Sequence, residues 1–414
     1  MGKVVKLIMV TAENNNKFYD MTEQKDGTFA VKYGRVEKTS VDESYPMAMW
    51  DKKYREKIKK GYTDVTHLYS EVVPAAKGTT QAAFTAITNS QVKQLIDALQ
   101  AYAKKSIQTN YTVTSDKVTE AQVNEAQKCL TDIMKLLAVG CKTNDLNTGI
   151  LKLYHIIPRQ MAHVSDHLFS KGTSLKDKDA VKAAKTKLDV EQDTLDVMAG
   201  QVALNKKNKV GEDPKEVKKT LTMLEVMGLE VEEADATAIK MIKDMMGPNA
   251  KQFHKAFKVV NNKTQTAYDK NMKAAVNKQT RFFWHGSRNE NWFNILSTGL
   301  LIRPSGAVYS GSAFGDGIYF ASKFQKSYGY TSGNGSYWAH GGSSKAYLAV
   351  FEVRVGKQFV TNSSGNFSYK SVQAAGGCDS TYAKPGNGGY LANEEFIIYK
   401  PDQCTIAYLL EVTA

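Results

Sequence analysis

Residues 284–288 read Trp-His-Gly-Ser-Arg, and this segment decides how the last third of the chain is interpreted. Two strand-like segments follow it, Gly317-Ile318-Tyr319-Phe320-Ala321-Ser322 and Asn393-Glu394-Glu395-Phe396-Ile397-Ile398-Tyr399. Each of the three segments carries one chemically versatile side chain, namely His285, Tyr319 or Glu395. We expect these segments to bring the three side chains together around one substrate.

The three segments resemble the His-Tyr-Glu signature of ADP-ribosyltransferases of the poly(ADP-ribose) polymerase type. The resemblance implies an enzyme that cleaves nicotinamide from NAD⁺ and transfers ADP-ribose to an acceptor. The transition state of such a reaction resembles an oxocarbenium ion, as in glycoside cleavage. NAD⁺ is therefore the expected substrate, and no metal is expected.

The resemblance also implies roles for the residues around the first segment. His285 would hydrogen-bond the adenosine ribose, with Ser287 beside it, and the backbone of Gly286 would pair with the nicotinamide amide. Glycine suits that position because it lets the backbone approach a ligand closely. Asn291 matches a ligand-side asparagine of the family. A histidine after a strand is more often structural, and it is the surrounding motif that favours ligand binding.

The second segment leads into a set of residues whose order and spacing match the family. These residues are Tyr319, Lys326, Ser327 and Tyr330. The two tyrosine rings would sandwich nicotinamide, because stacking on both faces suits a flat ring that becomes neutral on leaving. Ser327 would donate a hydrogen bond to the nicotinamide amide, and Lys326 would orient the acceptor. In the adenosine part of the site, Leu301 stands where the family often has arginine, so the contact to the adenosine half of NAD⁺ is either lost or supplied by Arg303.

The third segment contains two adjacent glutamates. Glu395 would bond the 2′-hydroxyl of the nicotinamide ribose and stabilise the positive charge that develops there. Glu394 is the alternative, because adjacent strand residues face opposite ways and the pattern alone cannot choose between them. The family's order of Glu, aromatic, Ile, aliphatic and Tyr selects Glu395.

Length and composition limit the class of protein. A chain of 414 residues is long for one core, so two or three domains are expected. No apolar run is long enough for a transmembrane helix or a secretory signal, and four scattered cysteines support neither disulfides nor a zinc finger. We therefore expect an intracellular protein, nuclear if the source is eukaryotic, that does not bind membranes.

The net charge of +13 favours a polyanion as partner. The first 75 residues are expected to form a small β-rich module, with a hairpin at Asp26-Gly27 and a basic helix from about Pro46 to Lys60. The segment Tyr33-Gly34-Arg35-Val36 is similar to the core of a WGR domain, which in that family contacts DNA near strand breaks. The DNA-contacting residues would be Tyr33, Arg35, Lys52, Lys53 and Arg55. A solvated helix face is the alternative for the basic run.

Residues 82–200 show helical periodicity and a capping box at Thr119-Glu120-Ala121-Gln122. Two pieces of this region, residues 153–158 and 188–191, resemble the helical regulatory domain that restricts access of NAD⁺ in DNA-dependent family members. Residues 201–414 would form the transferase domain, with strands joined by long loops. A linker is expected around Val72–Thr80.

The expected fold class is α+β, with a β-rich WGR-like domain, an all-α bundle and a mixed-sheet transferase domain. The expected function is poly-ADP-ribosylation of the protein itself and of DNA-bound acceptor proteins, stimulated by DNA strand breaks. The chain is expected to be monomeric without DNA. A mono-ADP-ribosyltransferase of the same architecture and an inactive DNA-end-binding scaffold are the alternatives.

Overall fold

The computed structural model describes residues 2–36, 38–69, 85–170, 172–209, 221–302, 313–386 and 391–413. Its contacts divide the chain into two compact units. The described part of the first unit lies within residues 1–81 and 105–205, and that of the second lies within residues 82–104, 206–305 and 311–413. The predicted linker, Val72–Thr80, lies outside the described residues.

An antiparallel sheet of the order β4-β3-β2-β1-β5 forms the N-terminal part of the first unit. Its strands are β1 (Val4–Thr11), β2 (Asn15–Glu23), β3 (Thr28–Arg35), β4 (Val41–Pro46) and β5 (Thr63–Asp64). The predicted hairpin is confirmed, since β2 pairs with β3 and Gly27 adopts a φ of +79° that favours glycine. The basic helix α1 (Trp50–Lys59) follows, and its Trp50 is buried against Phe29.

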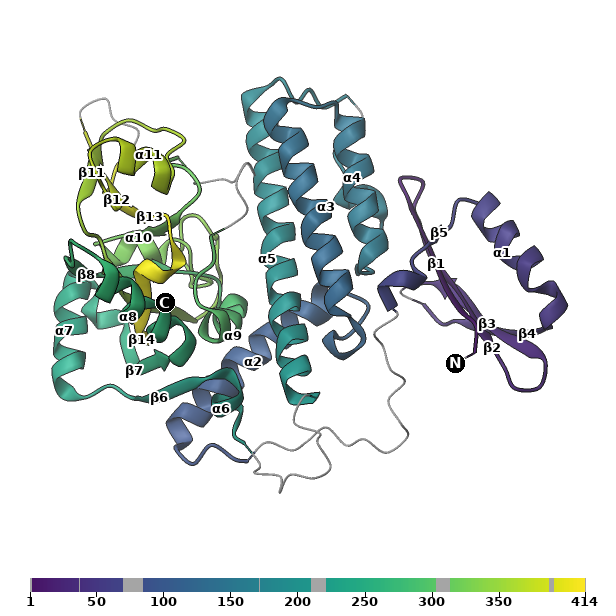
Figure 1. Ribbon diagram of the computed structural model, residues 1–414, viewed down its shortest axis with the longest axis horizontal. Coiled ribbons are helices and arrows are strands. Elements are labelled where there is room, and N and C mark those ends of the chain that lie inside the picture. Colours follow the sequence, from purple (N-terminus) through teal and green to yellow (C-terminus); the bar gives the residue numbers. More distant parts are fainter. Residues whose placement is uncertain are drawn as a thin grey trace. The chain divides into compact units, whose positions relative to one another are not determined.

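The region after residue 85 is helical, as predicted. Its long helices are α2 (Ser90–Asn110), α3 (Glu120–Val139), α4 (Thr143–Ile156) and α5 (Lys178–Lys209). The predicted capping box is present at Thr119 and Gln122. Helices α3, α4 and α5 lie side by side (Figure 1). In α4, a Cβ added at Gly149 would lie 2.6 Å from Cγ1 of Ile133, so glycine allows this close approach to α3.

The two parts of the first unit are joined by hydrogen bonds. The backbone N–H of Val10 in β1 donates to Nε2 of His155 in α4 at 3.1 Å. Helix α5 continues to Lys209, so residue 201, the expected start of the transferase domain, lies inside a helix. No helix among the described residues is long and apolar enough to cross a membrane.

The second unit contains two sheets, with strand orders β6-β7-β14-β10-β8 and β11-β12-β13-β9. The first sheet is antiparallel throughout, and the second is mixed because β11 and β12 are parallel. The strands of the first sheet are β6 (Leu229–Glu233), β7 (Phe253–Asn261), β8 (Thr280–Gly286), β10 (Lys345–Arg354) and β14 (Cys404–Thr413). Those of the second are β9 (Ile318–Phe320), β11 (Gln358–Thr361), β12 (Ser380–Ala383) and β13 (Glu395–Ile398).

Short helices lie in the connections between the strands of the second unit. They are α6 (Met223–Met227), α7 (Ala236–Met246), α8 (Asn262–Ala274), α9 (Asn289–Thr298), α10 (Phe324–Tyr328) and α11 (Tyr369–Ala374). Strand β10 is buried along nearly its whole length, which explains why its sequence is apolar on both faces. The α+β class is confirmed.

Candidate active site

The two sheets of the second unit meet where the predicted site residues lie. Trp284 of β8 forms an isolated antiparallel bridge with Ala321, just after β9, through backbone hydrogen bonds of 2.8 and 3.1 Å. Strand β9 pairs in turn with β13, which begins at Glu395. Three segments that are far apart in sequence therefore run next to one another.

His285 is fixed by a backbone carbonyl. Its Nδ1 lies 3.0 Å from the carbonyl oxygen of Tyr319. A carbonyl can only accept a hydrogen bond, so Nδ1 carries the proton and Nε2 of the neutral ring is an acceptor. Burial lowers the pKa of His285 to about 4, so the ring is neutral at pH 7. His285 therefore offers a hydrogen-bond acceptor of the kind that a ribose hydroxyl needs.

Gly286 lies directly against the backbone of α10. A Cβ added at this position would be 1.8 Å from the carbonyl oxygen of Ser327. Real side chains do not approach so closely, so only glycine fits without a shift of one of the two segments. This contact holds the His-Gly-Ser segment beside the helix that carries Lys326 and Ser327.

Ser287 and Asn291 are joined to each other. Nδ2 of Asn291 in α9 donates to Oγ of Ser287 at 3.0 Å. The ring nitrogen of Trp292 donates to the carbonyl oxygen of Ser287 at 3.2 Å and to that of Tyr347 at 3.1 Å. The backbone after β8 is thus held in place by side chains of α9.

The two predicted stacking tyrosines are held in different ways. The hydroxyl of Tyr319 donates to the carbonyl of Gly315 at 2.7 Å and accepts from the N–H of Phe314 at 3.0 Å. Burial raises the pKa of Tyr319 well above its usual range. Tyr330 is 39% exposed, and its ring stacks on that of Trp338 with centroids 6.1 Å apart. Tyr330 therefore already has an aromatic neighbour on one side.

The adjacent glutamates have different partners. Oε1 of Glu395 forms an ion pair with Nζ of Lys326, and both side chains are largely buried. Glu394 instead accepts hydrogen bonds from Oγ of Ser322 and, at 2.6 Å, from the hydroxyl of Tyr382. Burial favours a higher pKa for Glu394, but these hydrogen bonds, together with the charges of Arg281 and Lys323, outweigh it and the pKa lies below its usual range. The two carboxylates therefore belong to different groups of side chains.

Comparisons with known proteins give the family. The model of the poly(ADP-ribose) polymerase catalytic domain matches residues 236–414. A putative poly(ADP-ribose) polymerase-like protein, 100L of Invertebrate iridescent virus 6, is 34% identical over 190 residues, which are 44% of this chain and 98% of the viral protein. The chain belongs to the poly(ADP-ribose) polymerase family. Its C-terminal region is an NAD⁺ ADP-ribosyltransferase domain.

Two other relatives of this polymerase-family chain are matched over a smaller share of their own length. The uncharacterized protein 101L of the same virus is 34% identical over 200 residues, which are 48% of this chain and 78% of that protein. Poly(ADP-ribose) polymerase 2-A of Oryza sativa subsp. japonica is 32% identical over 157 residues, which are 31% of this chain and 22% of the plant protein.

Several residues of this polymerase-family site were not predicted from the sequence. Trp338, which is 56% exposed, stacks on Tyr330 from a glycine-rich loop, and Tyr337 lies edge-on to it. The adjacent aromatic pair in that loop is the signal that could have drawn attention to it. Tyr382 and Ser322, the partners of Glu394, have no such signal. The predicted NAD⁺ contact Arg303 lies outside the described residues.

The predicted DNA-contacting residues of the polymerase-family chain lie in the first unit, and Arg35 is bonded to the protein itself. Its guanidinium donates to the carbonyl and to Oδ1 of Asn14 at 2.8 and 3.1 Å, and to the carbonyl of Ala162 at 3.3 Å. Asn14 has a positive φ of 64°, so this arginine satisfies the backbone at a strained turn.

The other predicted DNA contacts are on β3 and α1. Tyr33 donates its hydroxyl to Oε1 of Glu43 at 2.9 Å. The ammonium of Lys53 lies 4.0 Å from the centroid of the Tyr45 ring. Lys52 and Arg55 are exposed, so α1 presents positive charge to solvent at these two positions.

The buried, neutral His285 predicts how the stability of this polymerase-family enzyme depends on pH. Between pH 6.5 and 4 the unfolded chain takes up a proton at this residue and the folded chain does not, so stability falls as the pH falls. His285→Gln removes this contribution, which reaches about 1.4 kcal/mol per pH unit. Between pH 7 and pH 5, we expect the unfolding free energy of the wild type to fall by more than that of the variant, so that the difference between the two changes with pH. Urea unfolding followed by tryptophan fluorescence measures it, and a constant difference would contradict the prediction.

Proposed function

We propose that this enzyme adds ADP-ribose units repeatedly and so builds poly(ADP-ribose) on acceptor proteins, including itself. The observation that carries the proposal is the largely buried ion pair between Lys326 and Glu395, next to the segment of His285 and Gly286. A carboxylate held by a lysine can stabilise positive charge on a ribose carbon and also assist an incoming hydroxyl. Both functions are needed each time a poly(ADP-ribose) polymer is extended by one unit.

In the proposed reaction, the bond between C1′ of the nicotinamide ribose and the nicotinamide nitrogen breaks. Nicotinamide leaves with the electron pair as a neutral ring. Glu395 accepts a hydrogen bond from the 2′-hydroxyl and stabilises the positive charge on C1′. An acceptor oxygen then bonds to C1′, and a hydroxyl acceptor passes its proton to the carboxylate of Glu395, which releases it to water. Lys326 keeps the carboxylate in position and orients the acceptor.

The other residues of the site would bind NAD⁺. His285 would accept a hydrogen bond from the adenosine ribose through Nε2, with Ser287 and Asn291 beside it. The backbone of Gly286 and the hydroxyl of Ser327 would bond the nicotinamide amide. Tyr319 and Tyr330 would stack on the two faces of the nicotinamide ring. Arg303 would contact the adenosine half.

We also propose that DNA strand breaks stimulate the reaction. The N-terminal module would be a WGR-like domain, and residues 82–200 would regulate access of NAD⁺. Support comes from the net charge of +13 and from the exposed cations Lys52 and Arg55 on α1. Tyr33, Arg35 and Lys53 complete the proposed DNA-contacting set. In a eukaryote such an enzyme would act in the nucleus in the response to DNA damage.

The experiment that tests this function is the incorporation of labelled NAD⁺ into protein, with and without nicked or blunt-ended DNA. We expect a high-mass smear on a denaturing gel that depends on DNA. A single sharp band would replace the proposal by mono-ADP-ribosyl transfer. Tight DNA binding without labelling would instead indicate an inactive scaffold.

A double charge reversal, Lys52→Glu with Arg55→Glu, is the variant arm of that experiment. It should lower DNA affinity, reduce the slope of log affinity against log salt by about 0.9 for each phosphate that the protein no longer neutralises, and leave the DNA-independent activity unchanged. The matched control is Lys128→Glu with Lys135→Glu, two exposed lysines of α3. An unchanged salt slope would assign the charges of α1 to solubility.

A further inference from the structure

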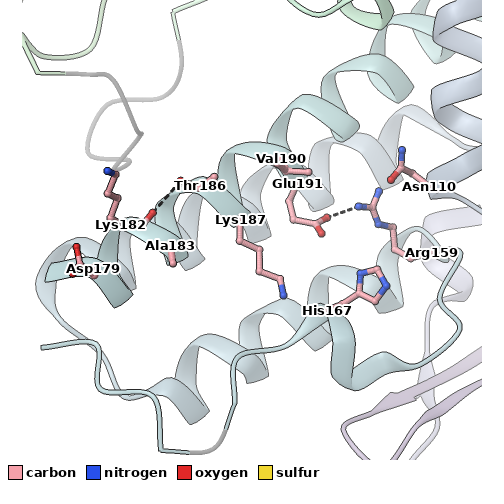
Figure 2. A pocket seen from close by; sticks show the side chains of 10 residues that line it. All are labelled: Asn110, Arg159, His167, Asp179, Lys182, Ala183, Thr186, Lys187, Val190 and Glu191. Atoms are coloured by element: carbon pink, nitrogen blue, oxygen red, sulfur yellow. Dashed lines mark hydrogen bonds and ion pairs between the residues drawn. The ribbon is translucent and has the colours of Figure 1, made fainter. Parts of the chain in front are cut away.

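A cavity of about 600 Å³ lies in the helical part of the first unit, among residues that have no role in the proposed transfer reaction. Its walls come from α5, from Asn110 at the end of α2, and from the segment between α4 and α5, which includes Arg159 and the short 3₁₀ helix Val164–His167 (Figure 2). The cavity has the size of small-molecule binding sites. Its side chains decide which ligand chemistry it favours.

Arg159 is a buried cation with an unused donor. Its NH2 group donates to Oε2 of Glu191 at 2.7 Å, while the other carboxylate oxygen accepts from the hydroxyl of Tyr154 at 2.9 Å. The side chain is 6% exposed, and the guanidinium lies over the ring of Tyr111. Its NH1 group is buried and has no hydrogen-bond partner among the described residues. Buried polar groups are nearly always satisfied, so this group points to an acceptor that the protein does not supply.

Lys187 brings a second cation to the cavity from α5. Its ammonium donates to the backbone carbonyls of Asp166 and Leu168, at 3.3 and 3.4 Å. No carboxylate in the described part of the chain forms an ion pair with it. Burial lowers the pKa of Lys187, which reflects the cost of holding this charge away from water. An anion in the cavity would remove that cost.

The remaining groups leave the cavity suited to an anion. The carboxylate of Glu191 already accepts hydrogen bonds from Arg159 and Tyr154. Among the other lining residues, the positive charge of Lys182 offsets the negative charge of Asp179. Burial lowers the pKa of His167, so its ring is neutral at pH 7, and its nitrogens make no hydrogen bond to any described residue. Figure 2 shows Lys187 extending from α5 toward His167, with Arg159 on the same side of the cavity.

We propose that this cavity binds a small molecule through an oxyanion group, either phosphate or carboxylate. NH1 of Arg159 and the ammonium of Lys187 would donate charge-assisted hydrogen bonds to the oxyanion, and His167 would add a neutral donor. Because these residues lie on α5 and on the segment before it, the ligand would fasten the two together. The bound protein would then unfold at a higher temperature.

The test titrates the full chain with inorganic phosphate and, separately, with acetate, at constant ionic strength. Calorimetry should show saturable binding of one of the two anions, and the melting temperature should rise with its concentration. The anion that binds more tightly distinguishes a phosphate-bearing from a carboxylate-bearing ligand. Lys187→Met should weaken binding about tenfold or more, and Lys187→Arg should retain it.

Lys185→Met is the matched control, because it removes the same charge from the same helix at a residue that does not line the cavity. It should bind the anion like wild type. An anion held in the NAD⁺ site would be insensitive to Lys187. The proposal is overturned if neither anion binds saturably, or if Lys187→Met binds as wild type does.

Discussion

Replacing Glu395 by glutamine is expected to lower the rate of ADP-ribosyl transfer about 100-fold or more. The substitution keeps size and hydrogen-bonding capacity but removes the negative charge that pairs with Lys326. Without that charge, nothing at this position stabilises the positive charge that develops on the ribose carbon. The rate of nicotinamide release and the length of the product on a gel measure the effect.

Glu394→Gln is the matched control for this prediction. It makes the same chemical change one residue away, at a side chain bonded to Ser322 and Tyr382 rather than to Lys326. We expect its activity to stay within a few-fold of wild type, and both variants to keep the far-ultraviolet circular dichroism of the folded chain. Long product chains from Glu395→Gln, or an equal loss in Glu394→Gln, would refute the assignment.

The second large effect is expected from Gly286→Ala. The new methyl group would lie 1.8 Å from the carbonyl oxygen of Ser327, so β8 and α10 must separate by more than an ångström. A displacement of that size in a binding site can cost about 100-fold in activity, and overpacking costs roughly 1–3 kcal/mol in stability. We expect a strong loss of activity together with a lower melting temperature.

Gly342→Ala is the control for this substitution. Gly342 is in the same unit, and a Cβ there would have no atom within 4 Å. The control should resemble wild type in both activity and melting temperature. If Gly286→Ala also behaved like wild type, the close contact with Ser327 would not be required, and the backbone of Gly286 would have no special role in binding NAD⁺.

Local chemistry explains which parts of the fold could be predicted. The Asp26-Gly27 hairpin depends on one residue that tolerates positive φ, and the start of α3 depends on a capping box that spans four residues. Strands β9 and β13 were predicted because apolar and aromatic runs mark buried strands. Strands β6, β7, β11 and β12 were not predicted, since polar residues interrupt their apolar runs.

The three site segments and their order along the chain could be recognised from the amino-acid sequence, because the residues that would contact NAD⁺ form short, contiguous motifs. The identity of Glu395 as the partner of Lys326 needed the folded chain, since the two residues are 69 positions apart. The same holds for the Nδ1 proton of His285, which depends on a carbonyl 34 residues away. Patterns of neighbouring residues carry no information on contacts of that range.

In the first unit, too, some properties follow from the sequence and others only from the folded structure. The positive charge of the chain is a property of composition, but packing decides which cations reach solvent. Arg35 bonds Asn14 and Ala162, while Lys52 and Arg55 remain exposed. The cavity beside α5 is likewise lined by side chains from separate helices and loops, and no sequence motif indicates it. Short-range chemistry can be read along a chain, whereas burial and long-range pairing exist only once the chain has folded.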